Sequence, residues 1–289
     1  MLSLLLIIVT GLVLVISSAY LFYRWDWKAL FIFAPVLIYY AISWEGSTGF
    51  PGLITPIIIG AAGGFAFRRG LQFKVYLVVT SLVIAGLVSG NYYYLKQYKN
   101  IDVVNLSKTE MIKILDKNSV SEDVKKQVAE DYDRWMDVFS DVIPFTSFLY
   151  SLIFSSLCYL VMKVFFIRLT GKLRAGGIEQ FRLNDYFIFF LITGWALFLL
   201  IDKSDYYMVN TAGLNVALIA SLLYAVQGLG VIKFLLIKKG LPLYIIPLGF
   251  FIIMIFGFGA LTFLVIMLAG FGALDLWADF RKFNTRDST

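Results

Sequence analysis

The sequence contains no histidine and a single cysteine, Cys158, among its 289 residues. One thiol excludes a disulfide within the chain, and the lack of histidine excludes His/Cys metal clusters and a Cys/His catalytic pair. Histidine is also the commonest general base in enzymes. No P-loop, His-Glu-x-x-His or Gly-x-Ser-x-Gly motif is present. We therefore expect a protein that is not an enzyme and that has no catalytic residue, metal site or cofactor.

Charged residues are scarce as well. They make up 15% of the chain, whereas 60% of the residues are hydrophobic and the mean hydropathy is +0.82. A soluble domain is about 45–50% apolar, so the main solvent of this chain is a lipid bilayer. Lipid offers no partner for backbone N–H and C=O groups, which favours a helical bundle. The net charge of +6 fits loop charges that set topology better than nucleic-acid binding, because no soluble basic domain carries it.

Apolar runs predict seven membrane spans before residue 240, at about residues 2–23, 27–44, 52–67, 75–94, 144–167, 186–201 and 207–232. The last apolar stretch, residues 241–277, would measure about 55 Å as one helix, nearly twice the thickness of the hydrocarbon core. Gly257-Phe258-Gly259 predicts a break near its middle. The prediction is an all-α integral membrane protein, a polytopic bundle of about nine spans with one exoplasmic helical loop. Eight spans are the alternative, and a re-entrant hairpin at the break is a variant of the nine-span topology.

The distribution of basic residues favours nine spans. With the N-terminus outside, the pairs Arg68-Arg69, Lys238-Lys239 and Arg281-Lys282 all fall on the inner side. Eight spans would place the basic tail outside. The predicted organisation is an N-terminal membrane half (1–94), a soluble loop (95–143), a C-terminal membrane half (144–280) and a basic cytoplasmic tail (281–289). We expect this arrangement in a bacterial cytoplasmic (inner) membrane.

The soluble loop is predicted to be exoplasmic and mostly helical. Ser107-x-x-Glu110 and Ser119-x-x-Glu122 have the pattern of capping boxes, which predicts helices at about 108–116 and 120–142. The second helix carries apolar residues at helical spacing: Val124, Val128, Trp135, Val138, Phe139 and Val142. This face packs either on the rim of the bundle or on a partner protein.

Few polar residues lie within the spans. Ser147, Ser151 and Ser155 share one helix face, which is either a packing groove or a polar stripe that lines a cavity. Asn215 and Gln227 are candidates either for ligand contacts or for hydrogen bonds between helices.

Small and charged residues complete the candidate sites. Gly60, Gly64, Gly86 and Gly90 form small-xxx-small faces, which allow a second helix to approach closely. Asp275 is the most deeply embedded acid. It is a candidate for an interfacial ion pair with Arg281 or Lys282, the alternative being a role in ion or proton coupling.

The C-terminal half resembles the YybS-like predicted membrane proteins of bacteria, a family defined by a domain of unknown function. Asn215, Tyr224 and Gln227-Gly228 resemble that family's span ending in a Gln-Gly turn. Gly272-Ala273-Leu274-Asp275, followed by Asp279-Phe280-Arg281-Lys282, resembles its closing signature. The resemblance implies a bacterial cytoplasmic membrane protein and no particular chemistry.

That family is similar, more distantly, to the S components of energy-coupling-factor vitamin transporters and to the rod-shape protein MreD. The similarity implies a ligand pocket or a role in assembly. S components that dock on a shared coupling subunit usually have small residues at i, i+4 of their first helix. Here that helix reads Leu4-Leu5-Leu6-Ile7-Ile8-Val9, which speaks against this kind of docking.

Two hypotheses from different classes follow. The favoured one is a non-enzymatic scaffold or accessory subunit of a membrane complex, with a membrane-protein partner or a second copy. The alternative is a small-molecule-binding transport protein that resembles an S component, with a mostly apolar pocket and few polar groups, such as Gln227, Asn215 and the Ser147 stripe. In both cases the bilayer is a partner and nucleic acid is not.

Overall fold

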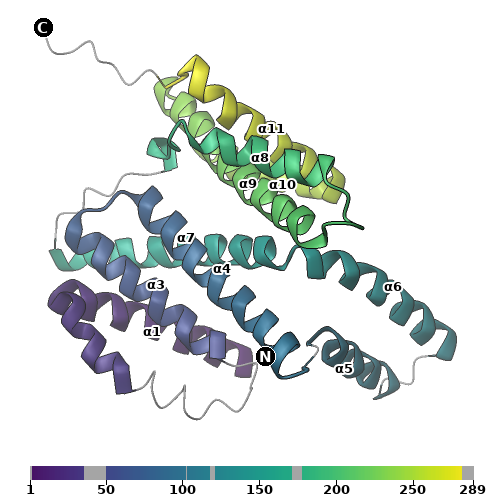
Figure 1. Cartoon of the computed structure of the whole chain (residues 1–289). Helices are drawn as coiled ribbons and strands as arrows, with labels where there is room; N and C mark the ends of the chain where they lie inside the picture. Colours follow the sequence, from purple (N-terminus) through teal and green to yellow (C-terminus); the bar gives the residue numbers. More distant parts are fainter. Residues whose placement is uncertain (1, 36–49, 102, 118–120, 171–177, 282–289) are drawn as a thin grey trace, which may run out of the picture. The chain divides into compact units, whose positions relative to one another are not determined.

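Helices account for all the regular secondary structure in the described part of the chain. The computed structural model describes residues 2–35, 50–101, 103–117, 121–170 and 178–281, and no β-strand occurs among them (Figure 1). Four helices there are long and apolar enough to cross a membrane, namely α4 (Phe73–Tyr98), α7 (Ile143–Thr170), α9 (Tyr207–Lys238) and α11 (Phe258–Ala278). The protein is therefore an all-α membrane protein, as predicted.

The described part of the chain contains eight further helical elements. They are α1 (Leu2–Trp25), the 3₁₀ helix η1 (Asp26–Ala29), α3 (Phe50–Arg69), α5 (Val103–Lys117), α6 (Glu122–Asp141), the 3₁₀ helix η2 (Ile178–Gln180), α8 (Phe187–Leu200) and α10 (Ile245–Ile255). Half of the predicted span 27–44, residues 36–44, lies outside the described residues, as does the tail beyond Arg281.

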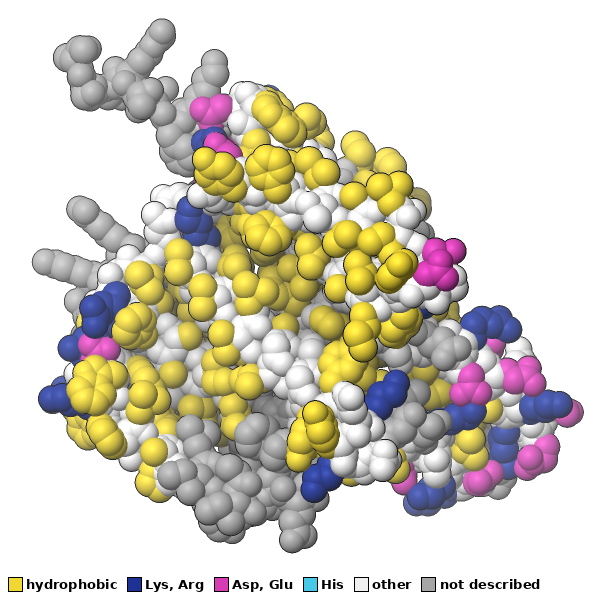
Figure 2. All heavy atoms as spheres, viewed as in Figure 1, with side chains coloured by type: hydrophobic (Ala, Val, Ile, Leu, Met, Phe, Trp, Pro, Cys, Tyr) yellow, Lys and Arg dark blue, Asp and Glu magenta, His cyan; other side chains and the backbone are white. Residues whose placement is uncertain are grey.

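The chain divides into two compact units. Unit 1 comprises residues 1–69 and 76–173, and unit 2 comprises residues 70–75 and 174–289. Helices α5 and α6, which fall in the segment predicted to be a soluble loop, therefore belong to unit 1, together with α7. Figure 2 shows many charged side chains of both signs over α5 and α6 and a smaller charged group at the opposite side of unit 1, whereas hydrophobic side chains cover much of the surface of the membrane helices.

In unit 1, α1 and α3 pack in parallel through glycine. A Cβ on Gly60 would overlap the carbonyl oxygen of Val15, and one on Gly64 would overlap that of Ala19. Contacts thus advance in the same direction along both helices. The chain between α1 and α3 must therefore return to the level at which α1 begins.

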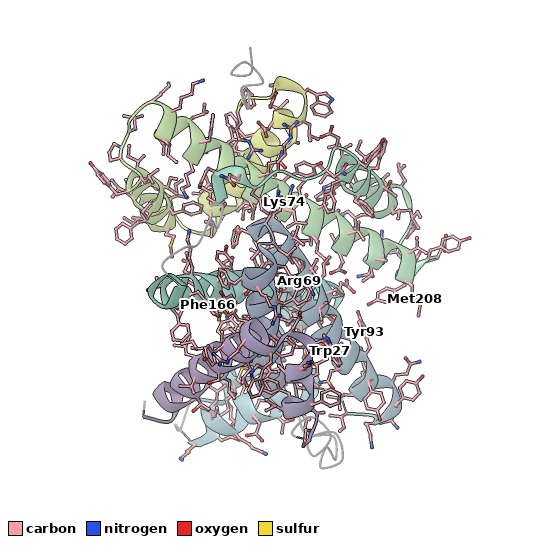
Figure 3. The ribbon with its side chains drawn as sticks, turned by 90° about the vertical axis from the view of Figure 1, so that its left-hand side faces the viewer. Trp27, Arg69, Lys74, Tyr93, Phe166 and Met208 are labelled. Atoms are coloured by element: carbon pink, nitrogen blue, oxygen red, sulfur yellow. The ribbon has the colours of Figure 1, made fainter. Side chains whose placement is uncertain are left out.

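Aromatic rings fill the other end of this packing. Phe166 of α7 (Figure 3) is buried, and its ring centroid lies 4.8 Å from that of Tyr23 and 5.0 Å from that of Phe67. Offset and tilted aromatic pairs at such distances stabilise a core beyond the area that they bury. They join α7 to the α1·α3 pair.

Two of the predicted packing glycines make no such contact. A Cβ on Gly86 or Gly90 of α4 would meet no atom within 4 Å. The prediction that they mediate helix packing is therefore not met by the described part of this chain. These positions have the same small-residue spacing as Gly60 and Gly64, but they lie on an exposed face of α4.

The predicted capping box at Ser107 is wrong. The helix begins earlier, at Val103, and Ser107 lies inside it with its hydroxyl donating to the carbonyl of Val103 at 2.9 Å. Serine makes this bond to the preceding turn when it lies within a helix. The second box falls on Ser119, outside the described residues, and α6 begins at Glu122.

In unit 2, α8 and α9 form an antiparallel hairpin. Asn210 of α9 donates to the carbonyls of Phe198 and Ile201, both at 2.8 Å, and Trp195 Nε1 donates to Ser221 Oγ at 3.2 Å. Asp202 closes the turn between the helices by accepting the backbone N–H of Ser204 at 2.9 Å.

Helix α11 packs against α9 in parallel. Gly228 and Gly272 lie at the same level, where a Cβ on one would overlap the carbonyl oxygen of Leu268 and a Cβ on the other that of Tyr224. The predicted break before α11 is present at Gly257, whose φ of +88° is a conformation that glycine adopts at little cost. Helix α10 has 11 residues, about 17 Å in length, so the helix alone is shorter than the hydrocarbon core.

Candidate functional site

Three buried polar residues of unit 2, Gln227, Asp275 and Arg281, gather where α9, α11 and η2 meet. The glycine contact brings α9 close enough for Gln227 to reach across: its Nε2 donates to the carbonyl of Gly272 at 2.9 Å and to Asp275 Oδ2 at 3.4 Å. Its Oε1 accepts the backbone N–H of Leu183 at 2.8 Å. Gln227 is fully buried, so its amide is committed to contacts between elements.

Asp275 and Arg281 form a fully buried ion pair beside Gln227. The side chains of both are 0% exposed, and Arg281 donates from Nε to Asp275 Oδ2 at 3.1 Å and from a terminal nitrogen to the same oxygen. The remaining guanidinium nitrogen donates to the carbonyls of Glu179 at 3.1 Å and Phe181 at 2.7 Å. The left-handed residue Asp279, with φ of +41°, ends α11 and turns the chain so that Arg281 comes back beside Asp275.

The structure gives the predicted charged residues of the closing segment different partners. Asp275 meets Arg281, one of the two basic residues proposed for it, whereas Lys282 lies outside the described residues. Asp279 pairs with Arg182 at 3.2 Å, near the surface. These contacts join α11 to the segment that precedes α8.

Sequence reasoning missed two members of this cluster, Glu179 and Arg182. Glu179 pairs with Lys233 of α9 at 2.7 Å and offers its carbonyl to Arg281. The only signal in the sequence is that Glu179 is the one acid between Arg168 and Asn184. The pairing itself depends on the loop folding back over α9.

Most polar groups of this cluster bond to one another, whereas Asp275 Oδ1 is buried and has no hydrogen-bond partner among the described residues. Gln227 and Arg281 make all their described hydrogen bonds within it, and among the described residues no group of three His, Cys, Asp or Glu side chains lies close enough to hold a metal ion. A half-satisfied buried network is destabilising, and a paired one fixes a unique arrangement. The cluster is a joint between helices rather than an open binding site.

The other predicted polar residues fall in two places. The amide of Asn215 donates to the carbonyl of Thr211 in its own helix at 2.8 Å. Ser151 is buried and donates to the carbonyl of Ser147 at 2.7 Å, and Ser155 is buried as well. Of the serine stripe, Ser147 lines a cavity, and Ser151 and Ser155 are not among its lining residues.

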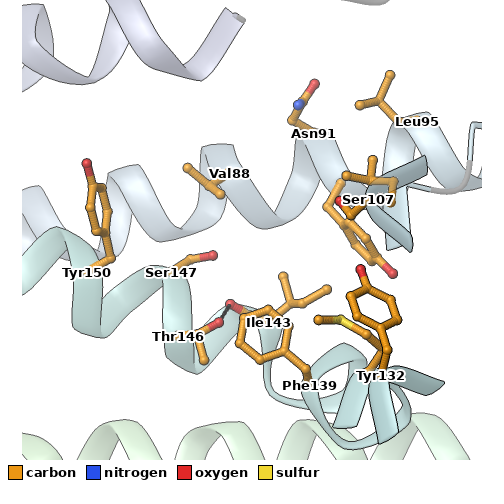
Figure 4. Close-up of a pocket in the computed structure, with 13 residues that line it drawn as sticks. Val88, Asn91, Leu95, Ser107, Tyr132, Phe139, Ile143, Thr146, Ser147 and Tyr150 are labelled. Atoms are coloured by element: carbon orange, nitrogen blue, oxygen red, sulfur yellow. Dashed lines mark hydrogen bonds between the residues drawn. The ribbon is translucent and has the colours of Figure 1, made fainter. Parts of the chain in front are cut away.

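That cavity lies in unit 1 among α4, α5, α6 and α7 and has a volume of about 670 Å³ (Figure 4). Sites for small molecules typically measure about 300–1,000 Å³ and are mostly apolar. The walls are mainly aliphatic and aromatic, with a few hydroxyls and one amide: Val88, Asn91, Tyr92 and Leu95 of α4, Val103 and Ser107 of α5, Tyr132, Met136 and Phe139 of α6, and Ile143, Thr146, Ser147 and Tyr150 of α7.

Two of the four helices that line this cavity, α5 and α6, come from the segment predicted to be a soluble loop. Only Val142 separates α6 from α7, so α6 stays beside the end of the span, and Pro144 in the first turn of α7 suits the start of a helix. Lys108 of α5 pairs with Asp133 of α6 at 2.6 Å, and Lys125 of α6 pairs with Asp116 of α5 at 2.6 Å. The hydrogen bonds that Lys125 donates to Asp116 and Glu122 raise its pKa. These pairs hold the two helices together above the cavity.

One protein-family profile matches nearly the whole chain. The sequence profile of the family described as "Predicted membrane protein (DUF2232)" matches residues 1–276. The chain belongs to this family. The YybS-like resemblance fits it, whereas the match carries no relation to S components or to MreD. No curated protein and no solved structure matches the chain.

Membership in the family supplies no chemistry. The description printed for it names a membrane protein and no activity. The matched range contains the cavity and Asp275 and ends before Arg281. The buried polar cluster of unit 2 and the cavity of unit 1 are therefore the features that bear on function.

Proposed function

We propose that this protein is a non-enzymatic, ligand-binding protein of the bacterial cytoplasmic membrane, which takes up a small, largely apolar molecule in the cavity of unit 1. The observation that supports it best is the cavity itself, with its size of about 670 Å³ and its mainly apolar walls from four helices. This proposal takes up the alternative hypothesis in place of the favoured scaffold hypothesis, but through different residues. Gln227 and Asn215 lie in unit 2, so only Ser147 is shared with the predicted pocket.

Native mass spectrometry of the protein in lipid nanodiscs tests the proposal. We expect a co-purifying small molecule that is lost in Val88→Trp, because the indole fills part of the cavity. Leu82→Trp is the matched control, since Leu82 is an exposed residue of the same helix that does not line the cavity. If Val88→Trp fails to fold, Ser147→Phe fills the cavity from α7. Retention of the same molecule by a folded, cavity-filled variant would overturn the proposal, as would a wild-type protein that carries none.

A second candidate, the scaffold or accessory subunit, is favoured by one face of α6. Trp135 is 73% exposed and Val138 60% exposed, although the sequence places both on the apolar face of the helix. An exposed apolar face of this kind is typical of an interaction surface. A photo-crosslinking residue at position 135 is expected to give a discrete protein adduct in cells, and the same residue at position 134, on the polar side, is expected to give none. Equal labelling at the two positions would remove this candidate.

For the topology, we propose nine crossings with the N-terminus outside and the C-terminus in the cytoplasm. Two parallel pairs support this number: α1 with α3, and α9 with α11. Each pair requires the chain between its members to return across the bundle. In the second case the return consists of α10 together with the apolar residues that flank it.

Cysteine labelling tests the orientation. In a Cys158→Ser background, Ser204→Cys in the turn between α8 and α9 is expected to react with an impermeant maleimide from outside. Lys239→Cys, after α9, is expected to react only after the membrane is opened. Labelling of position 239 in intact cells would contradict the proposed orientation.

A further inference from the structure

The walls of the unit 1 cavity specify a class of ligand. We infer that the cavity binds an uncharged amphipathic molecule whose polar end is a hydrogen-bond donor, as in a long-chain alcohol. This inference rests on the proposed binding function and adds the chemistry of the ligand. Three properties of the walls support it.

The first property is the absence of ionised groups among the lining residues. None of the 13 side chains around the cavity belongs to Asp, Glu, Lys or Arg. The charged neighbours of two lining residues are engaged with each other: Lys108, next to Ser107, pairs with Asp133, next to Tyr132, at 2.6 Å. A carboxylate, phosphate or ammonium placed between these walls would lose its hydration without gaining a counter-charge, which is strongly unfavourable.

An exposed cation, Lys96, also lies near the cavity, and an anionic ligand bound at it is the main alternative to an alcohol. The Nζ of Lys96 lies 6.0 Å from the centroid of the Tyr92 ring. Lys96 is exposed to water, where screening weakens its attraction for an anion. A fatty acid held at this lysine is therefore a separate outcome of the test.

The second property is the direction of the hydroxyl bonds. Ser107 Oγ donates its proton to the carbonyl of Val103 at 2.9 Å, and Thr146 Oγ1 donates to that of Ile143 at 3.0 Å (Figure 4). A hydroxyl has one proton and two acceptor lone pairs. With their protons used within the helices, both oxygens can offer only lone pairs to a ligand. The hydroxyl of Tyr92, a further lining residue, is buried without a hydrogen-bond partner among the described residues and can donate. A ligand hydroxyl, which both donates and accepts, complements all three groups.

The third property is the shape and nature of the remaining walls. Val88, Met136, Phe139 and Ile143 contribute apolar surface from α4, α6 and α7. Methionine adapts to irregular ligands because its chain is unbranched. These walls suit an aliphatic or aromatic body, so the ligand is amphipathic rather than a sugar or a nucleotide.

Photo-crosslinking with matched lipid probes tests the inference in nanodiscs that contain the full chain. The probes are an alkyl diazirine alcohol and the carboxylic acid and primary amine with the same chain, and the adducts are mapped by peptide mass spectrometry. We expect the alcohol to label the cavity-lining peptides of α4 and α7 about three- to tenfold more than the acid or the amine, the range that one hydrogen bond supplies. Val88→Trp is expected to abolish this labelling.

Removal of the two acceptors provides the second arm. The Ser107→Ala/Thr146→Val variant is expected to lower alcohol labelling to the level of the other probes. Ser156→Ala is the matched control, because Ser156 makes the same kind of bond, to the carbonyl of Leu152 at 2.7 Å, but does not line the cavity. If the double variant does not fold, the nearly isosteric Thr146→Val alone serves, with a smaller expected loss.

The possible results distinguish failure of the ligand class from failure of the binding function. Equal labelling of the cavity by all three probes, still lost in Val88→Trp, would overturn the ligand class and leave the binding function standing. Preference for the acid would identify Lys96 as the polar anchor and overturn the inference. If no probe labels the cavity peptides above the lipid-facing peptides, the binding function fails as well.

Discussion

The helix pairs α1·α3 and α9·α11 share one packing geometry and differ in how their polar residues are placed. In both pairs the helices run parallel and a glycine lies against a carbonyl of the partner helix: Gly60 and Gly64 against α1, and Gly228 and Gly272 between α9 and α11. Such contacts replace the hydrophobic driving force that lipid does not provide between helices.

The ends of the two pairs show the difference. In α1·α3, Arg68 and Arg69 approach Asp26 at 3.6 and 3.2 Å, and the arginine side chains are 38% and 55% exposed. In α9·α11, Arg281 and Asp275 are completely buried; Arg281 also donates to the carbonyl of Phe181, and Asp275 accepts a hydrogen bond from Gln227. Exposed ion pairs contribute about 0–1 kcal/mol, whereas removing one partner of a buried pair costs about 3–5 kcal/mol. The glycine contacts form both pairs, but only the second depends on a specific ion pair.

Breaking the buried ion pair has the largest expected effect. Arg281→Met leaves Asp275 buried without its counter-charge, so we expect unfolding to become easier by about 3–5 kcal/mol. Arg68→Met, the equivalent change at the exposed pair, is expected to cost less than about 1 kcal/mol. Steric-trapping or thermal measurements in one detergent compare the two. Adding Asp275→Leu to Arg281→Met is expected to recover part of the loss, and equal losses in the two single variants would contradict the comparison.

The glycine contacts come next. Gly272→Ala and Gly64→Ala are expected to destabilise by about 1–3 kcal/mol, because the added methyl overlaps a partner carbonyl. Gly86→Ala has open space around it and should stabilise α4 slightly, by about 0.5–1 kcal/mol, through helix propensity. The same unfolding assay tests whether Gly86→Ala changes stability in the opposite direction from Gly272→Ala and Gly64→Ala. A destabilising Gly86→Ala would indicate a partner helix at that position.

The amide of Gln227 is a further difference between the two helix pairs. Gln227→Leu leaves the buried N–H of Leu183 without its acceptor, with an expected loss of about 1–3 kcal/mol. In the α1·α3 contact, Ser18 bonds instead to the carbonyl of Leu14 in its own helix at 2.7 Å, so Ser18→Ala should be close to neutral. Hydrogen exchange at Leu183 provides a local readout, and unchanged protection there in Gln227→Leu would refute the role of this amide.

The smallest effect concerns an exposed polar contact of unit 2. The backbone N–H and then the hydroxyl of Ser204 hold the pKa of Asp202 below its usual value. Because the folded-state pKa is lowered, this stabilisation is present above the unfolded-state pKa near 4 and is lost as the pH falls through the folded-state pKa. Ser204→Ala should lower the melting temperature slightly at pH 7, and the difference should vanish below the folded-state pKa. A difference that grows in acid would contradict the assignment.

Part of the fold followed from the sequence because its signals are local. The run lengths and the lack of charge predicted the apolar helices, and Gly257 predicted the break before α11 because only a flexible residue suits such a position. The spacing of Asp275 and Arg281, within two turns of each other, predicted an ion pair. The capping box at Ser107 failed because the same hydroxyl satisfies either a helix start or a bond to the preceding turn.

What the sequence alone determined is the solvent, the helical class and the family. The tertiary structure decided which small-residue faces touch another helix, since Gly64 and Gly86 lie in similar patterns and only Gly64 meets a backbone. It also brought Glu179 to Lys233 and assembled the cavity from four helices spread over residues 88–150. These features arise from contacts between segments distant in the chain, and residue pattern along one helix cannot distinguish a neighbouring helix from lipid.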